Sequence, residues 1–231
     1  MRKRILVEFL FSLLAVAAVA AGLSIAGADL AIEALYYSTT TGWSQGNGAI
    51  WVFLYRYGNI PAFVIGGLGA LAFVLSFFSA KFLPDRKAGL FVVVFLILGP
   101  GLIVNTLFKD FWGRPRPSEI VQFGGTETYR PFWNPGTPGV GRSFPSGHAA
   151  IGFFIMAPYF VLRRSSPGWA RRALAAGILY GMLMGLCRMI QGGHFLTDVI
   201  WAGCLVYLTG LFLYYLFRLD REELPHHDTG A

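Results

Sequence analysis

The sequence predicts an all-α integral membrane bundle of six transmembrane helices, and two observations carry that prediction. First, 55% of the 231 residues are hydrophobic and only 13% are charged, a more apolar composition than a soluble domain of this length would have. Second, apolar runs of about twenty residues recur, which is the helix length needed to cross a hydrocarbon layer of about 30 Å. We therefore expect residues 1–231 to form a single membrane domain. The helices are expected at residues 5–27, 60–80, 88–108, 147–162, 173–191 and 195–217.

The first apolar run follows the basic segment Arg2-Lys3-Arg4, so a cleaved signal peptide is an alternative interpretation. The small residues Ala26-Gly27-Ala28 resemble a cleavage site. However, the run is longer than the roughly 7 to 15 apolar residues of a signal peptide. Its removal would also leave five spans and an inverted topology. A first transmembrane helix is the better interpretation.

The next segments carry weaker signals. Residues 28–59 are rich in tyrosine and tryptophan, which predicts an outer segment anchored at the membrane interface. Gly99-Pro100-Gly101 predicts a kink in the third helix. A pair of histidines, His226 and His227, falls in a polar tail that we expect to be solvated, with metal binding as the minor alternative.

The fifth helix carries Gly177, Gly181 and Gly185 at four-residue spacing, which predicts close packing against a neighbouring helix. The two cysteines, Cys187 and Cys204, differ in depth by roughly 7 Å at 1.5 Å per residue, so we expect free thiols rather than a disulfide.

Basic residues near the helix ends predict the topology. Six spans place twelve Lys and Arg on one side of the membrane and seven on the other. Because cytoplasmic loops carry the excess, both termini are expected in the cytoplasm. The net charge of +7 is compatible with anionic lipid, and no basic stripe or recognition motif indicates nucleic acid as a partner. Nothing in the sequence indicates an oligomeric state.

Three cations, Lys109, Arg116 and Arg188, fall on the non-cytoplasmic side of this topology. Charged residues beside lipid are costly, so such a cluster indicates a functional site. Three cations need an anion, and phosphate fits best because it accepts bidentate bonds from guanidinium and has oxygens for all three. A merely solvated loop is the alternative interpretation.

The segment Pro145-Ser146-Gly147-His148 opens the fourth helix on the same side. Free N–H groups at a helix start favour an anion, and glycine lets the backbone approach a phosphate oxygen closely. The imidazole of His148 would lie in that same turn. A plain helix entry without a ligand is the alternative interpretation.

His194 and Asp198 are four residues apart at the start of the last helix, so they share one helical face. The carboxylate can take the proton of one imidazole nitrogen and leave the other nitrogen as a nucleophile. In the alternative interpretation, Asp198 only pairs with Arg188 to satisfy a buried helix end.

Together these motifs resemble the type 2 phosphatidic acid phosphatase superfamily of membrane lipid phosphatases. The three signatures are matched by Lys109 with Arg116-Pro117, by Pro145 to His148, and by Arg188 with His194 and Asp198. One departure is visible, because Cys187 stands where the family usually has serine. That position is not a catalytic group in the family, so the change bears on local hydrogen bonding.

The resemblance implies a mechanism without a metal or cofactor. His194 would attack phosphorus and form a phosphohistidine, with Asp198 orienting its ring. His148 would protonate the leaving oxygen and later activate water. The phosphoryl oxygens would be held by Lys109, Arg116, Ser146, Gly147 and Arg188.

The loop from Arg114 to Pro131 also resembles, more weakly, the outer loop of bacterial lipid A phosphatases that act at the 1-position. This implies lipid A 1-phosphate as the substrate, at a periplasm-facing site of the inner membrane. Phosphatidylglycerophosphate, phosphatidic acid and undecaprenyl pyrophosphate are the alternatives. The additional cations Arg114, Arg130 and Arg142 are expected to favour a head group with more than one phosphate.

Two rival functions remain open at this point. A transporter of anionic lipids would use the same cations, but it predicts charges near the midplane of the membrane and paired broken helices. A metal enzyme would use His148, His194 and Asp198 as ligands.

Overall fold

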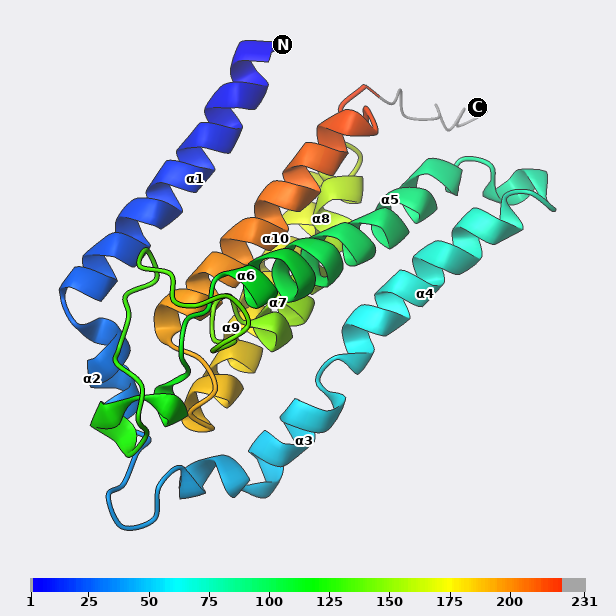
Figure 1. Ribbon diagram of the computed structural model, residues 1–231. Coiled ribbons are helices and arrows are strands. Elements are labelled where there is room, and N and C mark those ends of the chain that lie inside the picture. The colour runs from blue at the N-terminus through cyan, green and yellow to red at the C-terminus, as the bar shows by residue number, and fades with distance from the viewer. Residues whose placement is uncertain (1, 222–231) are drawn as a thin grey trace.

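The computed structural model describes residues 2–221 and confirms the all-α membrane bundle; the tail with His226 and His227 lies outside the described residues (Figure 1). No β-strand forms in the described part of the chain, where the only β-type pairing is two isolated bridges. The helices are α1 (Arg2–Ile25), α2 (Ala28–Ala34), α3 (Ala49–Tyr57), α4 (Ile60–Leu75), α5 (Arg86–Leu96), α6 (Lys109–Phe111), α7 (Gly147–Phe153), α8 (Ala157–Leu162), α9 (Pro167–Ile190) and α10 (Leu196–Leu216). Short 3-10 turns are η1 (Ser44–Asn47), η2 (Ala80–Phe82), η4 (Pro117–Glu119), η5 (Val121–Phe123) and η6 (Phe154–Met156), and η3 (Ile97–Phe108) is a π-helix.

Five helical stretches within residues 2–221 are long and apolar enough to cross a membrane, which differs from the six that we predicted. The fourth predicted span, Gly147–Leu162, is apolar but shorter, and it is built from α7, η6 and α8. The second span starts earlier than predicted, because α3 and α4 together form one stretch over Ala49–Leu75. The expected outer segment 28–59 is therefore partly helical, and its last residues belong to a span.

The predicted disturbance at Gly99-Pro100-Gly101 takes the form of a π-helix. Proline has no N–H to donate and its ring crowds the preceding turn, which interrupts the regular α-helical ladder. The side chain of Asn105 donates from Nδ2 to the carbonyl oxygen of Pro100 at 2.8 Å. The π-helix leads directly into α6, which begins at Lys109.

The glycine spacing of α9 predicted close helix packing, and the structure confirms it. Any side chain at Gly177 would collide with the backbone of Met156, and one at Gly181 would collide with the ring of Phe153. The helix therefore lies directly against the short apolar helix pair α7 and α8. Both cysteines are buried free thiols, also as predicted.

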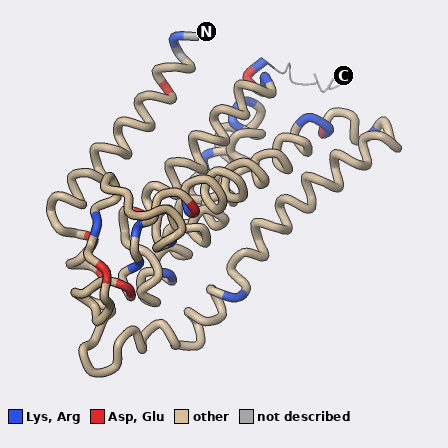
Figure 2. Tube along the Cα trace, viewed as in Figure 1, with Lys and Arg blue, Asp and Glu red and all other residues tan. Residues whose placement is uncertain are grey.

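The loops divide between the two ends of the bundle (Figure 1). One end carries the start of α1, the α4–α5 and α8–α9 connections and the end of α10. The other end, called the loop end below, carries α2, η1, the segment 112–146 and the bend 191–195. Figure 2 shows that α4 has no charged residue along its length and that α1 has none beyond Glu8. Glu8 itself pairs with Arg163 at 3.0 Å and so ties α1 to the bundle.

Candidate functional site

The three motif segments meet at the loop end. The backbone N–H of Ser118 donates to the carbonyl oxygen of Gly192 at 3.0 Å, which joins the first segment to the third. The N–H of Ser146 donates to the carbonyl oxygen of Asp198 at 3.2 Å, which joins the second to the third. A Cβ atom placed on Gly147 would lie 3.0 Å from Nζ of Lys109. The structure thus brings together residues that are up to 89 positions apart in the sequence.

His194 is the most enclosed histidine of the site, with 2% of its surface exposed. Its Nδ1 lies 2.6 Å from the carbonyl oxygen of Ser143. A carbonyl oxygen only accepts, so Nδ1 carries the proton and Nε2 keeps its lone pair. Burial lowers the pKa of His194 to about 4, and the cations Lys109 and Arg188 act in the same direction, while Asp198 opposes them. The imidazole is therefore neutral at neutral pH and presents a nucleophilic nitrogen.

Asp198 does not hold the imidazole directly, which corrects the expected pairing. Its Oδ2 lies 3.9 Å from Nδ1 of His194, too far for a hydrogen bond. The same oxygen accepts from the hydroxyl of Ser143 at 2.5 Å and from the N–H of Phe195 at 2.8 Å. Ser143 therefore stands between the two, because its carbonyl oxygen binds the histidine while its hydroxyl binds the carboxylate.

Arg114 is a second correction, because it is not available to a head group. The side chain is completely buried and donates to Asp198, to Asp29 at 2.7 Å and to the hydroxyl of Thr197 at 2.9 Å. Burial disfavours the charge, yet Asp198 and Asp29 together raise the pKa of Arg114 above its ordinary value. We call Asp29, Arg114, Thr197 and Asp198 the arginine network. Of the other two cations, Arg142 forms an exposed ion pair with Asp110.

Helix α2 supplies two buried carboxyl groups that our sequence analysis missed. Asp29 accepts from Arg114, from the hydroxyl of Thr197 at 2.7 Å and from the hydroxyl of Tyr129 at 3.1 Å. Glu33 is also fully buried, and neither of its carboxyl oxygens has a hydrogen-bond partner in the described part of the chain. Burial, followed by the charges of Asp198 and Asp29, raises the pKa of Glu33 to about 10. The sequence signal was an acidic pair at i and i+4 in a short apolar stretch.

The predicted phosphate-binding cations Lys109, Arg116 and Arg188 are all half-buried. The guanidinium of Arg188 lies over Gly193 and donates to the side-chain oxygen of Gln191. The Nε atoms of Arg116 and Arg188 are both buried, and neither has a hydrogen-bond partner within residues 2–221. Lys109 and Arg188 are close enough to both His148 and His194 to interact with them electrostatically. Two guanidinium donors are thus left unpaired, that of Arg188 near both imidazoles and that of Arg116 near Lys109 and Arg188.

Tyr55 is a further site residue that the sequence analysis did not identify as one. Its ring stacks on that of His148, with the centroids 4.8 Å apart and the planes at 20°. The guanidinium carbon of Arg188 lies 4.7 Å from the centre of the same ring. Tyr55 therefore contacts both His148 and Arg188 and helps to position them. Tyr55 could not be recognised as a site residue from the sequence because no helix was predicted within residues 28–59.

Two further positions from the sequence analysis, Ser146 and Cys187, make local hydrogen bonds to the backbone. The side-chain oxygen of Ser146 accepts from the N–H of Ala149 at 3.5 Å and so caps the start of α7. Cys187, at the position where serine is usual, donates from Sγ to the carbonyl oxygen of Trp51 at 3.3 Å. A serine there could donate to the same carbonyl oxygen, so the cysteine keeps this local hydrogen bond.

The three residues of the metal-enzyme alternative do not form a metal site. Within residues 2–221, no group of three His, Cys, Asp or Glu side chains is arranged to hold a metal ion. His194 uses Nδ1 for Ser143, and the carboxylate of Asp198 is occupied by Ser143, Phe195 and Arg114.

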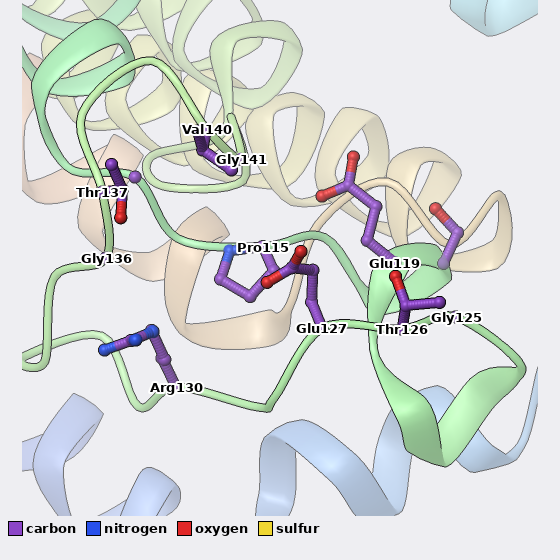
Figure 3. Close-up of a pocket in the computed structure, with 12 residues that line it drawn as sticks. Pro115, Glu119, Gly125, Thr126, Glu127, Arg130, Gly136, Thr137, Val140 and Gly141 are labelled. Carbon is purple, nitrogen blue, oxygen red and sulfur yellow. The ribbon is translucent and has the colours of Figure 1, made fainter.

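Two polar pockets lie among the loop-end segments. One, of about 420 Å³, is formed by the segment 113–141 and is lined by Glu119, Glu127 and Arg130 among others (Figure 3). None of the predicted site residues lines it. The other, of about 450 Å³, lies between η1, α3 and the end of α9, and Arg188 and Tyr55 are part of its wall. The second pocket therefore adjoins the histidine site through Arg188 and Tyr55.

The matches to known proteins all indicate the same family. A sequence model described as the PAP2 superfamily matches residues 88–222. A lipid A 4'-phosphatase of Francisella tularensis subsp. novicida is 39% identical over 151 residues, which are 64% of this chain and 66% of that protein. A lipid A 4'-phosphatase of Rhizobium leguminosarum is 34% identical over 120 residues, 50% of each chain. One of Rhizobium etli is 33% identical over 138 residues, 58% of this chain and 51% of that protein.

The matched part thus spans about half to two thirds of the length of these relatives. No solved structure gives a significant match.

Proposed function

Because the chain belongs to the PAP2 superfamily, we propose that it is a membrane lipid phosphatase that works through His194 as nucleophile. The single observation that carries this proposal is the state of that imidazole. Its Nδ1–H donates to the carbonyl oxygen of Ser143, its Nε2 is free, and its low pKa keeps the imidazole neutral. A neutral, oriented imidazole near the cations Lys109 and Arg188 suits attack on an anionic phosphoryl group.

In the first step, Nε2 of His194 attacks phosphorus and an N–P bond forms as the P–O bond to the lipid breaks. The leaving oxygen takes a proton from His148, whose protonated form is favoured by the negative charge of the bound substrate. Lys109, Arg116 and Arg188 hold the phosphoryl oxygens as their charge is redistributed. The unpaired Nε donors of the two arginines support this assignment.

In the second step, the neutral His148 takes a proton from water, and the resulting hydroxide attacks the phosphohistidine. The N–P bond breaks, inorganic phosphate leaves, and His194 regains its lone pair. Asp198 acts through Ser143 in both steps, because it fixes the hydroxyl of the residue whose carbonyl holds His194.

The proposed substrate is a lipid A phosphate in the outer-facing leaflet of the inner membrane. The support is the set of relatives named lipid A 4'-phosphatase, which favours the 4'-phosphate over the 1-phosphate expected from the loop resemblance. Phosphatidylglycerophosphate, phosphatidic acid and undecaprenyl pyrophosphate stay as alternative substrates. The excess of basic residues at the opposite end supports a site that faces the periplasm and termini that face the cytoplasm.

The test is phosphate release by the detergent-purified full chain from these four lipids, without added divalent ions and with a chelator present. Mass spectrometry of the lipid A product then distinguishes loss of the 4'-phosphate from loss of the 1-phosphate. We expect His194→Ala and His148→Ala to lower the rate by at least about 100-fold, the range seen when a general acid or base is removed. Arg171→Lys, at the far end of α9, serves as the control.

Undiminished turnover in either histidine variant would remove the assigned role. If no lipid releases phosphate while the protein moves anionic lipid between the leaflets of vesicles, the transporter is the correct function.

A further inference from the structure

The second polar pocket, of about 450 Å³, adjoins the histidine site and is not used by the proposed reaction. Its wall includes side chains of Thr41, Trp43, Ser44, Arg56 and Gln191, together with Arg188. Arg188 also faces Tyr55 at 4.7 Å, and Tyr55 stacks on His148. A phosphoryl group held by Arg188 would therefore leave the rest of its head group at the entrance of this pocket.

The lining has the chemistry of a sugar-binding surface. The hydroxyl of Ser44 donates to that of Thr41 at 3.0 Å. The amide of Gln191, which accepts from Arg188 and donates to the carbonyl oxygen of Gly46 at 3.4 Å, is also part of the lining. Hydroxyl and amide groups can exchange hydrogen bonds with the hydroxyls of a sugar, and the face of a ring such as that of Trp43 can cover its C–H surface. An acyl chain would find few apolar side chains here.

The aromatic wall is built before any ligand arrives. The ring of Trp43 lies 5.4 Å from Tyr37 and 5.5 Å from Phe123, measured between ring centroids. It also covers Gly192, where a Cβ would lie 2.5 Å from the indole and where φ is +64°. Only glycine fits both requirements, so the bend before His194 and the wall of the pocket are one structure. A preformed surface binds at lower entropic cost.

The charges of the two pockets differ in sign. Two guanidinium groups, of Arg56 and Arg188, line the pocket beside the histidines, and no carboxylate lines it. The pocket in the loop 113–141 instead contains Glu119 and Glu127 with a single arginine, as Figure 3 shows. An anionic ligand therefore fits the pocket beside the histidines and is opposed by the carboxylates of the pocket in the segment 113–141. Arg188 faces the reacting phosphoryl group, which leaves Arg56 for a second anionic group.

We propose that this pocket is the subsite for the sugar of a phosphorylated glycolipid head group, with Arg56 binding a second anionic group on that head group. The inference rests on the proposed phosphatase function and names the substrate class of that site. It assigns specificity to residues 41–56, which lie outside the three motif segments.

The test compares bisphosphorylated lipid A with phosphatidic acid, which has no sugar. We expect Arg56→Ala to lower kcat/KM for lipid A about tenfold more than for phosphatidic acid, chiefly through KM, as for the loss of one charged hydrogen bond. Arg56→Lys should restore part of the difference, because the charge is kept. Arg171→Lys is again the control. Arg130→Ala tests the rival pocket, and an unchanged ratio of the two activities in this variant is expected if the head group occupies the pocket of Arg56 and Arg188.

Binding measured without turnover separates this inference from the proposed function. In the His194→Ala background, Arg56→Ala should weaken the binding of bisphosphorylated lipid A about tenfold. Equal affinities with and without Arg56 would overturn the subsite whether or not the wild-type protein releases phosphate. A larger loss of affinity for Arg130→Ala would place the head group in the pocket of the segment 113–141 and would also overturn the proposed subsite.

Discussion

At the scale of single residues, the central feature is that a backbone carbonyl, and not a carboxylate, holds His194. The spacing of the histidine and aspartate motif predicted two residues on one helical face, but His194 precedes α10 and only Asp198 lies in it, with 3.9 Å between Nδ1 and Oδ2. It could not predict the partner, because Ser143 is 51 residues away in the sequence and is brought in by the loop. The motifs therefore predicted which residues gather, whereas the hydrogen bonds between them depend on tertiary structure.

Replacing Ser143 tests the indirect role of Asp198. Ser143→Ala keeps the carbonyl that holds His194 but removes the hydroxyl that donates to Asp198. Losing one hydrogen bond of about 1.4 kcal/mol corresponds to about a tenfold lower kcat with little change in KM. Steady-state phosphate release measures both constants, and Ser118→Ala, an exposed serine of the same loop, is the control. An unchanged kcat would mean that the hydroxyl does not position the nucleophile.

The charge state of His194 gives a second prediction. Burial and two nearby cations hold its pKa at about 4, so it should stay neutral as the pH falls through the ordinary histidine range near 6.5. NMR of the protein labelled in its histidine rings should show one resonance that titrates near pH 4 and that disappears in His194→Gln. A midpoint for that resonance near 6.5 would contradict the neutral, enclosed imidazole.

At the scale of elements, α2 is attached to the start of α10 by buried charges. Asp29 accepts from the backbone N–H of Thr197 at 3.0 Å and from its hydroxyl, and Arg114 links both helices to the loop. Hydropathy predicted the long helices but missed α2, because seven residues are too few to stand out beside a membrane span. It also placed the start of the second span too late, since residues 28–59 were taken as an outer segment whereas the span begins at Ala49.

The arginine network predicts a contrast between two arginines of the same loop. Arg114→Met would leave Asp29 and Asp198 buried without their cation, which costs about 3–5 kcal/mol of unfolding free energy. Arg142→Met breaks only an exposed ion pair with Asp110, worth about 0–1 kcal/mol. Denaturant unfolding of both variants in the same detergent provides the measurement. Equal losses of stability would show that the buried network does not anchor α2.

At the scale of the whole molecule, the sequence predicted a bundle whose polar segments share one end, and the structure agrees. Helix lengths and loop charges can both be read from short stretches of sequence. Together they predicted which helix ends lie on the same side of the membrane. The bounds 147–162 of the short apolar segment and close packing at the glycines of α9 were predicted, whereas the identity of the helix that packs against those glycines became visible only in three dimensions.

Labelling from outside the cell tests this topology. A cysteine at Thr126, at the loop end, should react with a membrane-impermeant maleimide in intact spheroplasts. A cysteine at Ser165, in the α8–α9 connection, should react only after permeabilisation. The unaltered protein is the control, because Cys187 and Cys204 are buried. Reaction of both new cysteines before permeabilisation, or of Ser165→Cys alone, would exclude the proposed orientation.

The shortness of the segment Gly147–Leu162 sets the level at which a lipid must be presented. Its sixteen residues rise about 24 Å, roughly 6 Å less than the hydrocarbon layer. With its Leu162 end level with the ends of the longer helices, His148 at its start would lie below the plane that those helices reach. A substrate phosphate then has to sink toward the acyl chains, or the bilayer has to thin around this helix. We therefore expect turnover in reconstituted vesicles to fall as the lipid chains lengthen, so that bilayer thickness acts as a regulator.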